Sequence, residues 1–445
     1  MQFKQYPSYK NSGVEWLGDV PEHWEVKKIK RISSVKRGAS PRPINDLKYF
    51  DDNGEYAWVR ISDVTRSNGF LFETEQRLSS LGASFSVKLE PESLFLSIAA
   101  TVGKPCITKI KTCIHDGFVY FPKLNKHRDL LFNIFESKLC FVGLGKLGTQ
   151  LNLNSETVED IYVAIPPESE EKAILGYIQT ETTRIDNLIA KQEKLIELLE
   201  EQRKSIISHA VTKGLNPNAP MKDSGVEWLG DVPEHWTVLK NRHIFRFSKG
   251  LSITKEHLQD SGIPCVSYGE VHSKFGFEFD PEINDMKFVS EEYLETSKNC
   301  LLNSGDFIFA DTSEDFEGSG NFSYLNSKSQ VFAGYHTVIA RLKSQQNPRF
   351  FAYVFDSNAH RKQIQTQIKG IKVFSITQGI LKDIYSWVPP VNEQHLIVEY
   401  LDQECSKISL LKLNQRNLIE KLKEYRSSII SHAVTGKIDV REFTA

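Results

Sequence analysis

The sequence lacks the features that mark membrane-spanning and secreted proteins. Among its 445 residues, no run approaches the roughly 18–20 uncharged apolar residues that a membrane span requires. Its first residues, MQFKQYPSYK, contain no apolar h-region, so we expect no signal peptide. The composition, 40% hydrophobic and 25% charged, is ordinary for a globular protein and excludes wholesale disorder. A soluble cytoplasmic protein of two or three domains is therefore expected.

Cysteines are few and scattered, which argues against a disulfide scaffold or a zinc site. No two of them form a Cys-x-x-Cys pair, and none has a histidine nearby at zinc-ligand spacing. We interpret them as reduced thiols buried as small hydrophobic side chains rather than as metal ligands. The six positions are Cys106, Cys113, Cys140, Cys265, Cys300 and Cys405.

The motifs of common catalytic sites are also missing. No phosphate-binding loop is present, since Gly103-Lys104 is followed by proline and Gly436-Lys437 by isoleucine. There is no Asn-Pro-Pro-aromatic motif of the kind that amino-methyltransferases use, and no glycine-rich methyl-donor loop follows a predicted strand. We therefore expect a chain that is not an enzyme by itself, with no catalytic residues, no metal and no cofactor of its own.

Charge is nearly balanced overall but uneven along the chain. The net charge is −2, yet residues 26–45 contain no acidic residue and seven lysines and arginines. A second acid-free run lies between Asp356 and Asp383 and carries five lysines and arginines. Local positive charge of this kind favours contact with phosphate groups. Ordinary solvated surface is the alternative interpretation.

The chain contains an internal repeat. The segment SGVEWLGDVPEHW occurs at Ser12–Trp24 and again, without a change, at Ser224–Trp236. The segment SIISHAVT occurs at Ser205–Thr212 and at Ser428–Thr435. The sequences between these repeated segments, which we call the two centres, barely match. Near-identical flanking segments, or frames, around divergent centres indicate two modules that have the same kind of function on different targets.

Each centre is predicted to be a mixed α/β domain. Apolar, β-branched runs predict strands at 56–59, 94–99, 119–121, 307–310 and 337–340. Helices are predicted at 129–140 and 348–367. Trp24 and Trp236 are the last residues of turn-like GDVPEHW segments, and we interpret them as core residues rather than as base-stacking side chains.

Heptad patterns follow the double prolines at Pro166 and Pro389. Apolar residues recur at alternating steps of four and three, as in the a/d seam of a coiled coil. The first seam comprises Ile174, Ile178, Glu181, Ile185, Leu188, Gln192, Leu195, Leu199, Gln202, Ile206 and His209. The second comprises Ile397, Leu401, Glu404, Ile408, Leu411, Gln415, Leu418, Leu422, Tyr425, Ile429 and His432.

Two such seams in one chain are expected to pair with each other. Antiparallel pairing within the molecule places one globular domain at each end of a rod, and the internal repeat gives it a pseudo-twofold axis. Gln192 and Gln415 lie at the midpoints of the two seams. A buried hydrogen bond between their amides is a candidate register lock. Two tolerated glutamines at the edge of the seam are an equally consistent interpretation.

This organisation resembles the specificity subunit of Type I restriction–modification enzymes. The resemblance rests on the duplicated GDVPEHW, the Pro-Pro exits and the paired helices ending in SIISHAVTKG and SIISHAVTGK, and it covers nearly the whole chain. It implies target-recognition domains at 1–167 and, with a linker, at 214–390. It also implies conserved long helices at 168–213 and 391–436, followed by a tail at 437–445.

The resemblance further implies function and partners. Each domain would read one half of a bipartite, asymmetric site in double-stranded DNA, while the helices would set the gap of unread bases and dock two methyltransferase subunits. Motor-nuclease restriction subunits would complete the complex, and S-adenosylmethionine would be bound by the methyltransferase partner. We expect no membrane partner.

Candidate DNA-contacting residues are those whose side chains can read bases or bind phosphate and that lie in predicted loops or at strand ends. A solvated loop side chain is the alternative for each. They are Arg37, Arg42, Arg60, Lys146, Thr149, Gln150 and Asn152 in the first domain, and Lys249, Ser267, Tyr268, Lys274, Asn321, Lys369, Lys372 and Gln378 in the second.

A coiled-coil scaffold that binds only proteins is the main alternative function. The helices alone fit it equally well. The two large and dissimilar domains inside near-identical frames argue against it, because a scaffold has no evident need for them.

Overall fold

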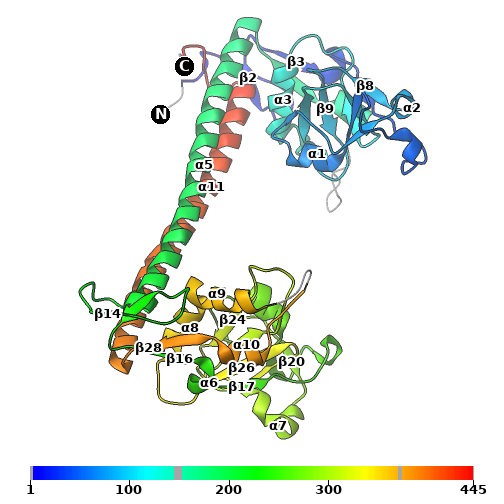
Figure 1. Ribbon diagram of the computed structural model, residues 1–445. Helices are drawn as coiled ribbons and strands as arrows, with labels where there is room; N and C mark the ends of the chain where they lie inside the picture. The colour runs from blue at the N-terminus through cyan, green and yellow to red at the C-terminus, as the bar shows by residue number, and fades with distance from the viewer. Residues whose placement is uncertain (1–3, 145–152, 369–372, 444–445) are drawn as a thin grey trace. The chain divides into compact units, whose positions relative to one another are not determined.

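The computed structural model describes residues 4–144, 153–368 and 373–443, and it confirms a mixed α/β fold with two long helices (Figure 1). The chain divides into two compact units, Met1–Glu193 with Arg416–Ala445, and Lys194–Gln415. Each unit contains one globular domain and part of both long helices, α5 (Glu168–Lys213) and α11 (Val391–Val434). Within the described residues, no helix combines the length and the apolar character needed to cross a membrane.

The first domain contains two larger sheets and two short ladders. The five-stranded sheet has the order β4 (Lys36–Arg37), β12 (Phe118–Tyr120), β9 (Leu94–Ser97), β10 (Pro105–Thr108), β6 (Phe70–Leu71). The four-stranded sheet has the order β7 (Gln76–Leu78), β5 (Tyr56–Val59), β11 (Thr112–Ile114), β8 (Val87–Leu89). The ladders are β1 (Tyr9–Asn11) with β2 (Asp19–Pro21), and β13 (Tyr162–Ile165) with β3 (Glu25–Lys28).

The second domain repeats both larger sheets and both ladders strand for strand, and it adds a third ladder. Its five-stranded sheet has the order β17 (Phe245–Lys249), β26 (Thr337–Leu342), β22 (Phe307–Ala310), β24 (Phe322–Leu325), β19 (Glu278–Phe279). Its four-stranded sheet has the order β20 (Lys287–Val289), β18 (Ile263–Val266), β25 (Val331–Ala333), β21 (Leu301–Leu302). Its ladders are β14 (Met221–Asp223) with β15 (Asp231–Pro233), β16 (Thr237–Lys240) with β28 (Tyr385–Val388), and β23 (Thr312–Ser313) with β27 (Phe374–Ser375).

Short helices complete both domains. The first contains α1 (Ile61–Arg66), α2 (Ser80–Ser84), α3 (Arg128–Glu136), α4 (Ser155–Glu159), and the 3-10 turns η1 (Ile29–Arg31), η2 (Leu47–Tyr49) and η3 (Leu139–Phe141). The second contains α6 (Asn241–Ile244), α7 (Tyr293–Thr296), α8 (Pro348–Asp356), α9 (Asn358–Gln367), α10 (Gln378–Asp383), the 3-10 turns η4 (Lys255–His257) and η6 (Lys298–Cys300), and a π-helical turn, η5 (Glu270–Lys274).

The five predicted strands are all present, whereas one predicted helix is shorter than expected and the other is broken in two. Strands β9 and β22 are buried at every position, as their continuous apolar runs LFLS and FIFA predict. The helix predicted at 129–140 stops at Glu136 and is followed by η3. The helix predicted at 348–367 is broken at Ser357, whose extended backbone and side-chain hydroxyl cap the start of α9. Serine favours such a cap over a helix interior.

The cysteines are free and mostly buried. Five of the six are buried and Cys405 is partly exposed. Burial raises the pKa of the Cys106 and Cys265 thiols to about 12, so both stay protonated at neutral pH. The interpretation as small core residues is therefore confirmed for the five buried cysteines.

The two long helices run antiparallel inside each unit. In the first unit, Asp186 of α5 forms an ion pair with Arg426 of α11 (3.0 Å), and Tyr177, earlier in α5, meets the ring of Phe443 beyond the end of α11. In the second unit, Glu200 of α5 pairs with Lys412 of α11. Gly214, just after the end of α5, lies against Glu393 near the start of α11. The predicted antiparallel direction is thus found in both units.

The predicted seam is buried toward the ends of the helices and open between them. Ile174, Ile178, Ile185, Leu199, Ile397, Leu401, Ile408 and Ile429 are buried. Leu188, Ile206 and Leu422 are partly buried. In contrast, Leu195, Leu411 and Leu418 are exposed by 39%, 46% and 41%. The structure therefore corrects the expectation of a continuous buried seam, because the domain cores that cover the helix ends do not extend over these leucines.

The two glutamines of the proposed register lock are half-buried. Gln192 belongs to the first unit and Gln415 to the second. Their pairing stays a prediction.

A hydrogen-bonded clamp ties the start of each long helix to its domain. In the first unit, Trp24 is fully buried and its indole Nε1 donates to Glu170 of α5 (2.9 Å), while His23 Nε2 contacts the other carboxylate oxygen (2.7 Å). The second unit repeats this arrangement, with Trp236 Nε1 donating to Glu393 of α11 (3.1 Å). The interpretation of both tryptophans as core residues is confirmed.

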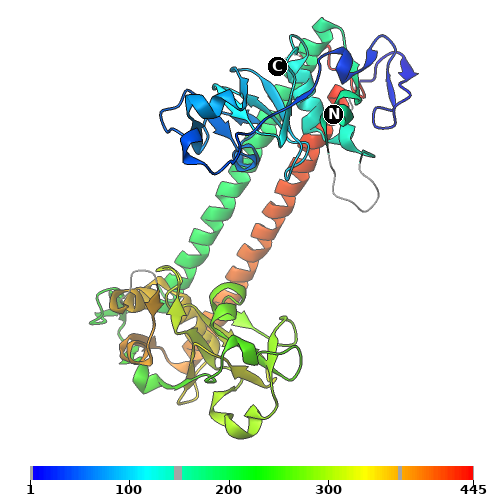
Figure 2. The ribbon, with the colours of Figure 1, turned by 90° about the vertical axis from the view of Figure 1, so that its right-hand side faces the viewer.

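The end of the opposite helix covers the same tryptophan. Gly436, just after α11, lies against Pro21 and Trp24, and its φ of +68° and the lack of room for a Cβ both require glycine. Gly214, just after α5, lies against Trp236 in the same way. In the first unit this brings the first and last described segments of the chain near one another (Figures 1 and 2), and the backbone N–H of Asp439 donates to the carbonyl of Lys4 (2.8 Å).

We predict that Glu170→Ala lowers the free energy of unfolding by about 1–3 kcal/mol, because it leaves the buried indole N–H of Trp24 without an acceptor. Chemical denaturation of the full chain measures this. Glu168→Ala is the matched control, since Glu168 is an exposed carboxylate in the same first turn of α5 and pairs with exposed Lys172. Equal effects of the two substitutions would contradict the role of the clamp.

Candidate nucleic-acid interface

Two candidate residues occupy the same position in the two domains. Arg37 ends the edge strand β4 and stands opposite Val119 of β12, and Lys249 ends the edge strand β17 opposite Val338 of β26. In both domains a glycine follows, and its N–H donates to the first residue of the neighbouring strand (2.9 and 3.1 Å). Each domain therefore presents an exposed basic side chain at the same end of its five-stranded sheet.

In the first domain, Asp116 gathers positive charge at this end of the sheet. It lies in the turn between β11 and β12, where its carboxylate accepts hydrogen bonds from Ser40 Oγ (2.8 Å) and from Arg42 Nη2 (3.0 Å). Its backbone carbonyl accepts from Arg37 Nε. The hydrogen bond from Ser40, together with the charges of Arg42 and Arg37, lowers the pKa of Asp116. A charged Asp116 thus holds two arginines in place, of which Arg42 is 73% exposed.

Arg60 belongs to the same group. It caps the start of α1, and its backbone N–H donates to Asp63 (2.8 Å). Burial lowers the pKa of His115, and the nearby charges of Arg37 and Arg60 lower it further, so this imidazole is neutral at pH 7. Arg37 and Arg42 contact this turn, while Arg60 follows strand β5, whose Val59 pairs with Ile114 just before the turn, and its guanidinium donates to Gln76. The three arginines were predicted from separate parts of the sequence. We call them the basic cluster.

The equivalent turn of the second domain is aromatic. Tyr335 and His336 lie between β25 and β26, and both contact Tyr268, with ring centroids 5.7 and 5.6 Å apart. His336 Nδ1 is 3.1 Å from the carboxylate of Asp311. Lys249 is the candidate cation beside this group, as the last residue of β17. Tyr268, Tyr335 and His336 form what we call the aromatic cluster.

Strand register shows which side chains correspond. Ile114 pairs with Val59 in the first domain, and Ala333 pairs with Val266 in the second. The residues after these strands, Arg60 and Ser267, are therefore equivalent. Both donate their backbone N–H to an acidic side chain three residues later (2.8 and 3.0 Å). The backbone is the same at this site, but the side chains differ in charge and size.

Other candidates are placed less favourably for reading DNA. Ser267 is fully buried, so its predicted direct contact with a base is corrected: the side chain belongs to the interior of the strand end. Asn321 accepts from Arg361 (2.9 Å) and donates to the carbonyl of His272 (3.2 Å), which holds η5 in place. Lys274 contacts Asp285, and Gln378 accepts from Lys382 (3.3 Å). DNA contact by Lys274, Asn321 and Gln378 stays a prediction.

Six candidates lie outside the described residues. They are Lys146, Thr149, Gln150 and Asn152 in the first domain, and Lys369 and Lys372 in the second.

Sequence reasoning missed the turn residues themselves. His115, Asp116, Tyr335 and His336 all lie between two apolar strands, in CIHDGFVY and FAGYHTVIA. The Asp-Gly pair in the first segment is a turn signal that could have marked the site. The second has only a glycine before its aromatic pair.

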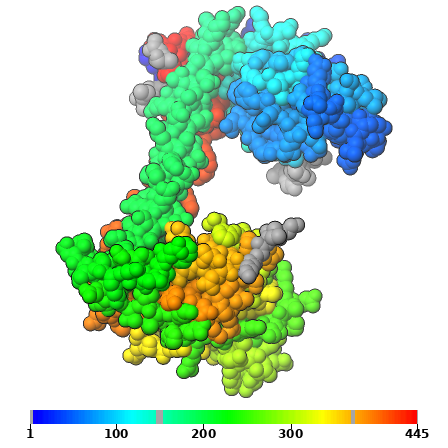
Figure 3. Space-filling model, viewed as in Figure 1, coloured from blue at the N-terminus to red at the C-terminus, as the bar shows by residue number. Residues whose placement is uncertain are grey.

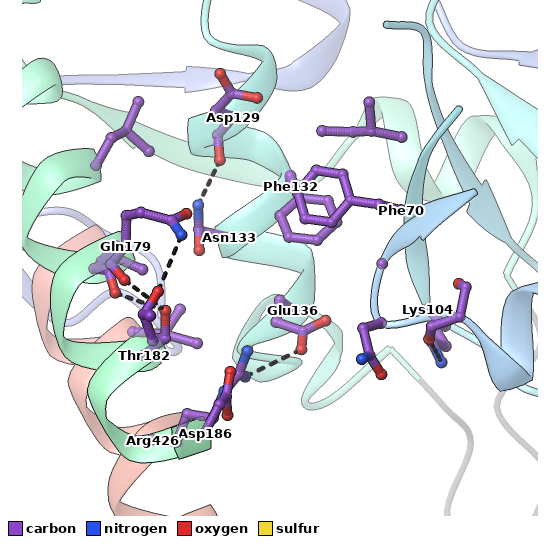
Figure 4. Close-up of a pocket in the computed structure, with 18 of the residues that line it drawn as sticks. Phe70, Lys104, Asp129, Phe132, Asn133, Glu136, Gln179, Thr182, Asp186 and Arg426 are labelled. Atoms are coloured by element: carbon purple, nitrogen blue, oxygen red, sulfur yellow. Dashed lines mark hydrogen bonds and ion pairs between the residues drawn. The ribbon is translucent and has the colours of Figure 1, made fainter. Parts of the chain in front are cut away.

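A large groove in the first unit has the wrong charge for DNA. It has a volume of about 910 Å³ and lies between α3, α5 and the loops beside β6 and β10 (Figure 4). Asp129, Glu136, Asp186 and Glu193 line it, and Arg426 is already paired with Glu136 and Asp186. This surplus of carboxylates would repel phosphate, so the groove is excluded from the candidate interface.

In the second unit, side chains fill the position that is equivalent to this groove. Arg349 Nε of α8 donates to both carboxylate oxygens of Asp402 of α11 (2.8 and 2.9 Å), and Arg349 also contacts Glu278 of β19. Tyr353 also donates to Asp402, and Arg349 lies over the ring of Phe277 (5.3 Å). The second domain is therefore joined to α11 by a charge network, whereas the first leaves an open groove against α5.

Comparison with known proteins gives the family. The family model described as the Type I restriction modification DNA specificity domain matches residues 21–200 and 233–421. The chain belongs to this family. Its two matched segments correspond to the two copies of the internal repeat, so the predicted resemblance is confirmed.

Individual relatives match over nearly their whole length. The chain is 24% identical to the specificity subunit of the Type I restriction enzyme MjaVIII from Methanocaldococcus jannaschii, over 95% of this chain and 94% of the relative. It is 23% identical to the specificity subunit of EcoKI from Escherichia coli K12, over 95% and 90%.

Two solved structures share the fold. One, from work on complex assembly and conformational transition of the type I R-M system, has a TM-score of 0.68 at 15% identity and covers 93% of this chain and 98% of its own. The HsdS subunit from Thermoanaerobacter tengcongensis has a TM-score of 0.51 at 14% identity and covers 94% and 98%. Membership of the specificity-subunit family implies recognition of DNA sequence.

We predict that Arg42→Ala weakens DNA binding by the assembled complex and reduces the slope of log K against log salt concentration by about one, as expected when one phosphate group is no longer neutralised. Lys111→Ala is the matched control, because it removes one exposed positive charge at the opposite end of β11, where Lys111 pairs with Glu55. Titration of labelled duplex at several salt concentrations measures both. An unchanged slope for Arg42→Ala would remove this residue from the interface.

Proposed function

We propose that this chain is the DNA-recognition subunit of a Type I restriction–modification complex, and that each domain reads one half of a bipartite, asymmetric site. One observation carries the proposal. The two domains share a strand order and a local backbone, yet the basic cluster of one stands where the aromatic cluster of the other stands. Duplicated scaffolds with divergent side chains at one exposed place are what two readers of different sequences require.

The chemistry of the two clusters suits different kinds of contact. Arginines beside a turn supply bidentate donors for guanine or for phosphate. Tyrosine and histidine rings supply apolar faces and single polar atoms, and Lys249 supplies a charge for phosphate. The first domain is thus expected to provide more of the salt-dependent affinity than the second.

The long helices are proposed to set the distance between the half-sites. At about 1.5 Å per residue, the 46 residues of α5 span about 69 Å. One turn of DNA rises about 34–36 Å, so a rod of this length is compatible with readers on separate turns of the duplex. Each helix is fixed to one domain at its start by a tryptophan–glutamate clamp, which makes it suitable as a spacer.

The partners are proposed from the family. Two methyltransferase subunits would dock on the helices, and restriction subunits would join them in the full complex. S-adenosylmethionine would be bound by the methyltransferase partner, and this chain would contribute specificity without catalysis. The exposed leucines Leu195, Leu411 and Leu418 offer apolar surface for such docking.

Two measurements test the function. Gel shift of the complex assembled with its methyltransferase partner should show much tighter binding to selected than to random duplex, whereas a protein-only scaffold would show no preference. Labelled methyl donor should be incorporated into DNA only when the partner is present. Methylation by this chain alone would contradict the proposal.

We predict that inserting four helix-forming residues after Leu195 in α5 and after Leu418 in α11 lengthens the unread gap by about one to two base pairs, since four residues add about 6 Å. Methylome sequencing of cells that carry the variant with its partner measures the gap. Inserting the same residues beside Ile283, in an exposed turn, is the control and should leave the gap unchanged. An unchanged gap in the helix variant would refute the spacer role.

A further inference from the structure

The first domain exposes a group of large apolar side chains at one edge. Leu47 is 84% exposed and Phe85 is 54% exposed, and Ile44 and Leu81 are also exposed. They come from η2, from the segment before it, and from α2 and the residue after it. We call these four residues the apolar tip. The segment that carries η2 forms part of the outer surface of the first domain in Figure 3, in deep blue.

Hydrogen bonds and ring packing hold the apolar tip in one conformation. Asp46 accepts from the backbone N–H of Lys48 at the start of η2, and Ser79 caps α2 by accepting from Gly82 (3.2 Å). The backbone of Ser79 also donates to the carbonyl of Tyr49 (2.9 Å), which joins the two short helices. The ring of Phe85 packs edge-on against that of Tyr49, 5.9 Å away. Ordered apolar side chains that remain in solvent indicate a contact surface.

The tip adjoins the basic cluster. Tyr49, which packs against Phe85, donates its hydroxyl to the carbonyl of Arg42 (3.0 Å). Ser86, next to Phe85, donates to the carbonyls of Ala39 (2.8 Å) and Ile114 (3.2 Å), and these residues flank the β4 end and the turn that holds Asp116. Positive charge for phosphate and apolar surface are therefore parts of one continuous face.

The second domain has a polar tip at the equivalent place. Its short helix η4 also precedes a strand of the four-stranded sheet, and the isolated bridge Gln259–Phe288 matches the bridge Phe50–Leu78 of the first domain. The exposed residues there are Thr254, Lys255, Glu256 and His257. The apolar tip is thus specific to one domain, as expected of a residue set that distinguishes one half-site from the other.

We propose that the apolar tip, led by Leu47, contacts the 5-methyl groups of thymines in the half-site that the first domain reads. This proposal rests on the proposed function. Double-stranded DNA is the one occupant that satisfies both parts of the face, because its phosphates suit Arg37 and Arg42 and its major groove offers an apolar group. That group is the thymine methyl, which the other three bases lack.

Replacing thymine by uracil in the probe removes only this methyl group. The test uses the complex assembled with its methyltransferase partner and a duplex carrying the sequence that the complex selects from random DNA, made with thymine or with uracil. The wild-type complex is expected to bind the uracil duplex about fourfold more weakly for each thymine methyl group that the tip covers. Leu47→Ser is expected to bind both duplexes equally, at the weaker level. Because Leu47 is exposed, this substitution leaves the fold intact.

Ile283→Ser is the matched control, an aliphatic residue 82% exposed in the second domain beside acidic residues. It should retain the wild-type preference for thymine. Equal wild-type binding to both duplexes would overturn the proposal, as would a Leu47→Ser variant that keeps the preference. Loss of self-association or of partner binding in Leu47→Ser, with the thymine preference retained, would assign the tip to a protein contact. If the complex selected no sequence at all, the proposed function would fail first.

Discussion

The architecture of each unit depends on a buried hydrogen bond between an indole N–H and a carboxylate. In the sequence, most of the first domain lies between Trp24 and Glu170, and most of the second lies between Trp236 and Glu393. Each bond fixes the first turn of a long helix to the beginning of the domain that precedes it. Because the glycine that ends the opposite helix lies on the same tryptophan, one residue orders three parts of the chain. The identical GDVPEHW segments are explained by this constraint.

The same frame holds two domains that differ in how they are joined to the helices. Arg349, Asp402, Glu278 and Tyr353 close the junction of the second domain with α11. Asp129, at the position of Arg349, cannot form this pair, and the junction of the first domain with α5 is an open acidic groove. An equivalent arginine is nevertheless present on both helices, since Arg203 contacts Asp356 and Arg426 contacts Glu136 (3.3 and 3.4 Å). The arginine contacts that both units share anchor the helices. The contacts that differ close the junction of the second domain with α11 and leave the junction of the first domain with α5 open.

Much of the fold could be predicted from the sequence because it depends on local pattern and on repetition. The double prolines, the heptads and the duplicated tryptophans identified both long helices and the limits of the repeat. The centres were harder, since their short strands pair across large sequence distances. A helix break at Ser357 was missed because the apolar pattern continues beyond it.

Only part of the site could be predicted, because its residues come together from distant parts of the sequence. Arg37, Arg42 and Arg60 were found from charge and residue type, but Asp116, which contacts Arg37 and Arg42, is an acidic residue 74 positions beyond Arg42. Nothing in a single sequence connects the two. Ser267 was wrongly placed at the surface, because its equivalence to Arg60 becomes visible only in the strand register. The aromatic cluster joins Tyr268 to a turn that carries no charge signal.

The central claim is that each domain reads its half of the site independently of the other. Its most direct test is a chimera in which the segment between Lys28 and Tyr162 is replaced by that between Lys240 and Tyr385, residues that pair across equivalent ladders. The chimera, assembled with its methyltransferase partner, would be used to select binding sites from random duplex DNA. The account predicts that the selected site contains the half-site of the second domain twice. Persistence of the first half-site in the selected DNA would contradict it.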